Sequence, residues 1–140
     1  MRLALGDDHA VADWLGRKMG MEFHPPYVTM RIEDDEGRIK AAYLFNNYNR
    51  NSIEVSAYGR DAIQRRFIRA VADYAFNQLG VIYLRARTKR SNKRMVHMLP
   101  KFGFEYEGTL KRWYGPAKGD DALLFCGARD NAMKWGIKYG

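Results

Sequence analysis

The sequence has 140 residues, of which 46% are hydrophobic and 14% aromatic, so it is long enough for one domain with a packed core and too short for two. This composition excludes general disorder, and the lone cysteine, Cys126, excludes an internal disulfide framework. The 24 lysines and arginines outnumber the 16 aspartates and glutamates, and the resulting net charge of +8 favours an anionic partner such as nucleic acid or a phosphorylated cofactor.

Targeting and membrane segments are not expected. No run approaches the roughly 18 consecutive apolar residues of a membrane span. The start Met1–Leu5 runs directly into Asp7 and Asp8 rather than into a signal-peptide core. We therefore expect a cytoplasmic protein without a membrane partner.

Hydropathy periods and turn residues predict the order of the elements. Strands are expected where apolar and polar residues alternate, and helices where apolar residues recur every three to four positions. In chain order the predicted elements are a strand over 2–5, a helix capped by Asp7 or Asp8 and stopped by Gly20, strands over 27–33, 39–46 and 52–58, a helix over 62–79, a strand over 81–87, a helix over 91–101, strands over 104–113 and 121–126, and a short helix over 130–137.

The three strands over 27–58 are expected to form an antiparallel meander, because short polar turns connect them. In the middle strand, alternation predicts one apolar face made of Ile39, Ala41, Tyr43 and Phe45. The helix over 62–79 is the most regular, with apolar residues every four positions. Together these elements predict a single α+β domain over residues 1–140.

The stretch from Asn92 to Gly108 resembles a signature of the GNAT superfamily of acyl-CoA-dependent N-acetyltransferases. In that family an Asn opens a helix, a Gly-Phe pair follows and a Glu-Gly pair comes shortly after, as in Asn92, Gly103-Phe104 and Glu107-Gly108 here. The element order matches over nearly the whole chain, and the resemblance is nearest to small bacterial and phage members and the ribosomal-protein N-acetyltransferase branch. It implies a GNAT-like mixed, mainly antiparallel central sheet flanked by helices.

The resemblance also implies acetyl-CoA as co-substrate and where it binds. In the family, the pantetheine arm pairs with the strand before the central helix, and the diphosphate lies at the turn into that helix. This turn departs from the family's glycine-rich loop, because Gly59, Ala62 and Gln64 replace signature residues. Arg60 and Arg65 are expected to supply charge to the diphosphate, and the alternative is that these arginines form a solvated helix face. The expected cofactor-binding residues are Val55, Ser56, Ala57, Arg60, Ala62, Gln64, Arg65 and Asn92.

Glu54 is the candidate general base, or a residue that holds a water acting as one, because it is the only acid on the strand over 52–58. The alternative is a solvated acid on an open strand face. Many relatives carry a tyrosine or serine that protonates the departing thiolate, and the corresponding positions here are Leu99 and Met95. The general acid therefore cannot be assigned from the resemblance.

Three functions remain open. The first is transfer of an acetyl group to an amine of an unidentified acceptor, which is a protein, a small molecule or a modified nucleotide. The second is an inactive protein of this fold that binds nucleic acid through the basic stretch 85–94, and the third is one that binds a partner protein. No metal is expected, because His9, His24 and His97 lack ligand spacing, and the protein is expected to be a monomer or a homodimer.

Overall fold

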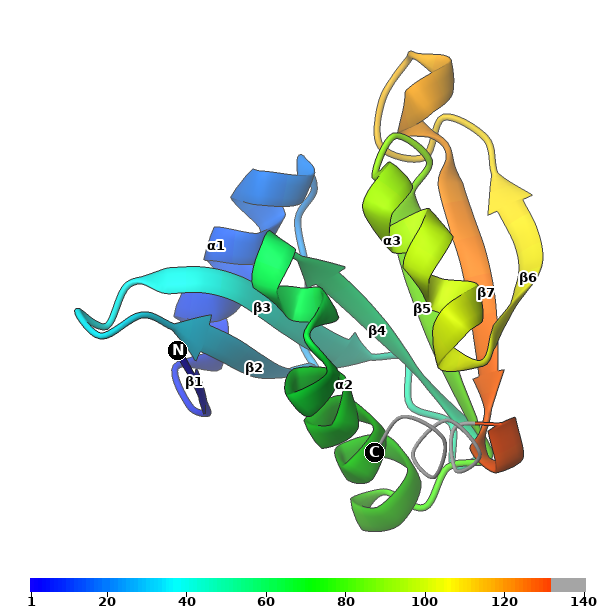
Figure 1. Cartoon of the computed structure of the whole chain (residues 1–140). Coiled ribbons are helices and arrows are strands. Elements are labelled where there is room, and N and C mark those ends of the chain that lie inside the picture. The colour runs from blue at the N-terminus through cyan, green and yellow to red at the C-terminus, as the bar shows by residue number, and fades with distance from the viewer. Residues whose placement is uncertain (132–140) are drawn as a thin grey trace.

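The structure is a computed structural model, and its description covers residues 1–131 (Figure 1). Every strand predicted from the sequence is present, and the helix predicted over 130–137 lies, from residue 132 on, outside the described residues. The elements are β1 (Arg2–Ala4), α1 (Asp8–Met19), β2 (Val28–Glu33), β3 (Ile39–Asn46), β4 (Ser52–Tyr58), the 3-10 turn η1 (Arg60–Ile63), α2 (Arg65–Ala72), the π-helical turn η2 (Asp73–Gln78), β5 (Tyr83–Lys89), α3 (Lys93–Met98), the 3-10 turn η3 (Leu99–Phe102), β6 (Phe104–Leu110), the 3-10 turn η4 (Lys118–Asp120) and β7 (Ala122–Ala128).

The strands form one seven-stranded sheet in the order β1-β2-β3-β4-β5-β7-β6. Among these strands only β4 and β5 are parallel neighbours, and every other pair is antiparallel. The crossover between the parallel strands carries α2, as such a connection requires. The prediction of a mixed, mainly antiparallel α+β sheet is therefore confirmed.

Helices cover both faces of the sheet (Figure 1). On one face α1 buries Val11 and Leu15 against Ala42 and Leu44 of β3. The other face carries α2 and α3 over a larger core. The large side chains of that core are Met30, Ile32, Tyr43, Phe45, Ile53, Val55, Phe67, Val71, Phe76, Leu84, Met95, Leu99, Leu123 and Phe125.

No helix within residues 1–131 combines the length and the apolar character that a membrane crossing requires.

The predicted apolar face of β3 is wrong at Ile39. Ile39 packs with the α1 cluster, whereas Ala41 lies in the larger core on the other face. The pairing with β2 shifts at this point, because Glu33 pairs with Ile39 while the preceding Ile32 pairs with Ala41. The extra residue in β3 is a β-bulge, which reverses the alternation that the strand pattern assumes.

Asp7, one of the two predicted cap residues, holds the N-cap position of α1, but its side chain does not cap the helix. The residue before the helix is Asp7, which has a φ of 54° and makes no side-chain capping bond. The carboxylate of Asp8 instead accepts hydrogen bonds from the backbone amide and the hydroxyl of Thr29, at 3.1 and 2.6 Å. A strand 21 residues away therefore competes for the acid that the local pattern assigned to the helix.

The helix predicted over 62–79 is divided into three segments, which are η1, α2 and η2. Residues 60–63 form η1, Gln64 is extended with a ψ of 135°, and regular helix begins only at Arg65. The carbonyl of Ala62, which a continuous helix would use internally, accepts the hydroxyl of Tyr43 from β3. This tertiary contact keeps the chain before α2 as a separate turn.

Candidate functional site

β4 and β5 separate towards their carboxyl ends, and this separation creates the site. Their last register pair is Ser56 with Arg87. Beyond it, residues 57–58 of β4 pair with β3 alone, and residues 88–89 of β5 pair with β7 alone. The facing edges of both strands therefore carry backbone groups that no neighbouring strand uses. Figure 1 shows the two strands diverging beneath α3.

An open groove of about 520 Å³ occupies this gap. Its lining includes residues 57–60 at the end of β4 and in the following turn, residues 88–89 of β5 and the start of α3. Lys18 at the end of α1 and Tyr114 in the β6–β7 loop line it from the face that α1 covers. The volume lies in the range of ligand sites in proteins, and residues from both faces of the sheet line the groove.

The groove is strongly positive. Among the cationic side chains that line it, Lys89 pairs with Asp120 at 3.2 Å. The side chains of Arg60 and Arg94 have no ion-pair or hydrogen-bond partner among residues 1–131. No carboxylate is among the described lining residues, so an anion would meet attraction along the whole groove. The four cations that line it are Lys18, Arg60, Lys89 and Arg94.

The structure brings only some of the predicted cofactor residues to the groove. Ala57, Arg60 and Asn92 line it. Val55 lines a neighbouring apolar cavity instead, and Ser56 is buried in the paired part of β4.

The remaining predicted cofactor residues belong to the turn before α2 and are not in the groove lining. Ala62 is fully buried beneath the Tyr43 hydroxyl, and the Gln64 side chain donates to Asp61 at 2.7 Å. Arg65 is exposed at the start of α2. Nothing in the geometry of this turn favours a direct contact between these three side chains and a ligand in the groove.

Gly59 is required by packing rather than by an anion. Its φ is 110°, and a Cβ at this position would lie 2.6 Å from the carbonyl oxygen of Lys40 and from the Cβ of Ala41. The turn therefore presses onto β3, and a larger residue in place of Gly59 would force the two strands apart.

Glu54 is not a solvated acid. Its side chain is 13% exposed and accepts a hydrogen bond from Arg87 at 2.7 Å, as part of an ion pair. Asn47 donates to the other carboxylate oxygen. Glu54 lies on β4 two residues before the last register pair with β5, and it is not among the residues that line the groove.

Tyr114 reaches the same region from the β6–β7 loop. Its hydroxyl is buried and has no hydrogen-bond partner among the described residues, and neither does the Nε of Arg87. Burial raises the pKa of Tyr114 to about 12, and the charges of Arg87 and Glu54 act on it as well. A buried polar group without a hydrogen-bond partner lowers the stability of the fold by about 1–3 kcal/mol. The Tyr114 hydroxyl and the Arg87 Nε are therefore places where a ligand or a water would bind.

Trp113 completes this side of the site. Its indole ring lies 4.9 Å from the guanidinium of Arg87, so the loop covers the Arg87–Glu54 pair. Lys18, Arg87 and Arg94 are not among the site residues predicted from the sequence. Arg87 and Arg94 lie in the basic stretch 85–94, whose charge was the available signal.

Asn92 has a structural role as well as a place in the groove. It caps α3, with its side-chain oxygen accepting from the Met95 amide at 3.3 Å. Within residues 1–131 no three His, Cys, Asp or Glu side chains cluster as metal ligands.

The sequence matches no protein-family model and no curated protein. It is similar in structure to a mutant of the spermidine N-acetyltransferase SpeG from Vibrio cholerae, with a TM-score of 0.73, 14% sequence identity and coverage of 97% of this chain and 99% of that one. It is also similar to a spermidine N-acetyltransferase of the same organism in complex with CoA and spermine, with a TM-score of 0.70, 16% identity and coverage of 94% and 97%.

These likenesses extend over nearly the full length of both chains. Low identity at this coverage establishes the arrangement of elements rather than the substrate. The chain therefore has the fold of the GNAT N-acetyltransferases.

Proposed function

We propose that residues 1–140 form one acyltransferase domain that transfers an acyl group from an acyl-CoA, acetyl-CoA in the simplest case, to an amine. The observation that carries the proposal is the groove between β4 and β5, which is open, positively charged and lined by no carboxylate of the described chain. A nucleotide with a diphosphate and a further phosphate suits this lining, and a structural neighbour was solved with CoA and spermine.

The cofactor's arm would lie along the open edge of β4. Val55 and Ser56 already pair with β5, so backbone contacts to the pantetheine begin at Ala57 and run towards the turn. Added as a short strand, the arm would use the backbone groups that the divergence leaves unpaired. Arg60 and Arg94 then hold the phosphates at the wide end, with Asn92 between them and the thioester.

The reaction is placed at the closed end of the groove. A primary amine with a pKa near 10.4 costs about 4–5 kcal/mol to deprotonate at neutral pH, so a nearby base helps. The amine nitrogen attacks the thioester carbon, Glu54 takes the amine proton directly or through a water, and the C–S bond breaks. Tyr114 gives its proton to the departing thiolate, and both groups then exchange protons with water to return to their starting states.

Nucleic-acid binding finds less support. Four cations of the basic stretch already form ion pairs with carboxylates, so binding to nucleic-acid phosphates would have to break these pairs. The pairs are Arg85 with Glu107, Arg87 with Glu54, Lys89 with Asp120 and Arg90 with Asp121, at 2.7–3.2 Å.

The test is release of CoA thiol from acetyl-CoA in the presence of a panel of primary amines that includes spermidine, a peptide with a free N-terminus and a lysine peptide. Wild-type protein is expected to release thiol with at least one amine. Glu54→Gln should lower kcat about a hundredfold and leave acetyl-CoA binding intact, whereas Glu36→Gln in the distant β2–β3 turn should change nothing. Equal rates for Glu54→Gln and wild-type protein would remove Glu54 from the chemistry.

A further inference from the structure

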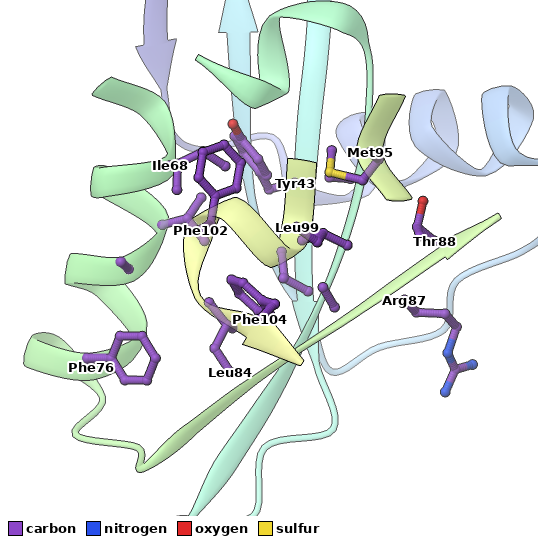
Figure 2. A pocket seen from close by; sticks show the side chains of 15 residues that line it. Tyr43, Ile68, Phe76, Leu84, Arg87, Thr88, Met95, Leu99, Phe102 and Phe104 are labelled. Carbon is purple, nitrogen blue, oxygen red and sulfur yellow. The ribbon is translucent and has the colours of Figure 1, made fainter. Parts of the chain in front are cut away.

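A second, enclosed cavity of about 50 Å³ lies between α2, η3 and the sheet (Figure 2). Its walls are almost entirely apolar, and the side chains of Tyr43, Phe76, Leu84, Leu99 and Phe104 gather around it (Figure 2). The room exists because alanines stand where larger residues would fill a core, at positions 57, 72 and 86. An apolar cavity of this kind stays free of water and takes up apolar groups.

The polar residues in its wall do not make it a water site. The hydroxyl of Tyr43 is used by the carbonyl of Ala62. Arg87 lies at the edge of the cavity, but its guanidinium pairs with Glu54, and Figure 2 shows it extending away from the other lining side chains. The cavity is therefore a mainly apolar space, in which the Tyr43 hydroxyl is already used and the Arg87 guanidinium extends away.

This cavity adjoins the charged groove. Ala57, Thr88 and Met95 line both. Two of them, Ala57 and Thr88, are the first residues of β4 and β5 beyond their last register pair. The entrance therefore lies where the strands begin to separate, which is the place given above to the thioester.

Resting on the proposed function, we propose that this cavity receives the acyl chain of the donor, and that the protein prefers acyl-CoA thioesters longer than acetyl. The space holds roughly three to four water-sized spheres, so a chain extending two to four carbons beyond acetyl fills it. Butyryl-CoA and hexanoyl-CoA are the expected best donors. Much longer chains meet the aromatic wall of Phe76 and Phe104.

Calorimetric titration of the full chain with CoA, acetyl-, propionyl-, butyryl-, hexanoyl- and palmitoyl-CoA tests this proposal without knowledge of the acceptor. Each methylene that enters the cavity should tighten binding about fourfold, the equivalent of about 0.8 kcal/mol, up to butyryl or hexanoyl. Palmitoyl-CoA should bind more weakly than hexanoyl-CoA. Affinity that is equal across the series, or that falls after acetyl, would overturn the inference and leave the proposed function standing. Failure of every compound to bind, free CoA included, would overturn the function itself.

Cavity-filling variants identify the place where the chain binds. Ala72 on α2 lines the cavity, so Ala72→Leu should fill it. Ala70 on the same helix does not line the cavity, so Ala70→Leu controls for the effect of a leucine on the helix itself. Ala72→Leu should abolish the gain from acetyl to hexanoyl while free CoA binds as in wild type, and Ala70→Leu should keep the gain. Ala86→Leu on β5 provides an independent second filling, in case Ala72→Leu does not fold. A gain that persists in every folded filling variant would contradict the assignment.

Discussion

Tyr114 is the residue whose chemistry the structure constrains most. Its pKa is raised to about 12 by burial, so it carries its proton at neutral pH. Replacing it by Phe removes that proton and little volume. We expect Tyr114→Phe to lower kcat tenfold to a hundredfold with the affinity for acetyl-CoA unchanged, as measured by steady-state thiol release and calorimetry.

Tyr58→Phe is the matched control for this prediction, because Tyr58 lines the same groove and is 39% exposed. It should retain wild-type kcat. A sharper readout is the dependence on the thiol that departs: the Tyr114→Phe defect should shrink when the donor is an acyl thioester of a more acidic thiol. A defect of the same size for both donors would show that Tyr114 does not protonate the thiolate.

At the residue level, the sequence predicted the candidates that depend on one strand and missed those that depend on a distant partner. Glu54 was identified because it is the only acid on its strand, but its pairing with Arg87, 33 positions later, depends on β4 and β5 being neighbours. Ala62 and Gln64, which are predicted to contact the cofactor, form hydrogen bonds with Tyr43 and Asp61, and neither lines the groove. Local pattern does not encode such competition.

Among the elements, the turn from β4 into α2 is the most constrained. Gly59→Ala is expected to lower the free energy of unfolding by about 2–4 kcal/mol, because the new Cβ would combine an unfavourable positive φ with overlap against β3. Gly37→Ala is the control: its φ is 80° and nothing lies within 4 Å, so it should cost only about 1 kcal/mol. Urea unfolding of both variants measures the difference, and equal losses would mean that the close approach to β3 has no energetic weight.

The elements themselves were largely predictable and their ends were not. Alternation located every strand, because most strands carry a clear period of two. The β-bulge at Lys40 and the break at Gln64 were missed, since each arises from pairing or packing against another element. The helix over 62–79 shows this most clearly: its apolar stripe is real and buries Phe67, Val71 and Ala75, yet the backbone before Arg65 follows β3.

For the whole molecule, the carboxylates predict how stability depends on pH. The Arg31 side chain, which donates a hydrogen bond to Glu33, lowers the pKa of that carboxyl, and the Arg112 amide does the same to the pKa of Asp121. A backbone hydrogen bond likewise lowers the pKa of Asp34. These groups bind protons more weakly in the folded state than in the unfolded one, so their stabilisation is present above their ordinary pKa, near 4, and is lost as the pH falls through the folded values.

Urea unfolding between pH 8 and pH 3 checks this prediction. As far as these carboxyl groups determine it, the urea concentration at half-unfolding should be level from pH 8 to about 5 and should fall steadily below about pH 4. Asp121→Asn removes one of them and should reduce the acid-induced loss while lowering stability at pH 7. A midpoint that stays level to pH 3 would contradict the role of these hydrogen bonds.

The net charge shows what whole-sequence reasoning reaches. A surplus of +8 predicted an anionic partner without locating it. In the structure, Arg85, Arg87 and Arg90 pair with carboxylates, Lys89 both pairs with Asp120 and lines the groove, and Arg60 and Arg94 line the groove with no side-chain partner among residues 1–131. That division depends on strand order, in which β5 lies between β4 and β7, and the sequence does not state it.

Calorimetric titration with acetyl-CoA tests the central claim most directly, using wild-type protein, the double variant Arg60→Ala/Arg94→Ala and the surface control Arg17→Ala. Wild type and control should bind one equivalent with micromolar affinity, and the double variant should bind about tenfold to a hundredfold more weakly, because each charge-assisted hydrogen bond to phosphate contributes about 1.5–3 kcal/mol before solvent screening. No heat of binding with wild-type protein, or equal affinity in all three proteins, would contradict a CoA site between β4 and β5.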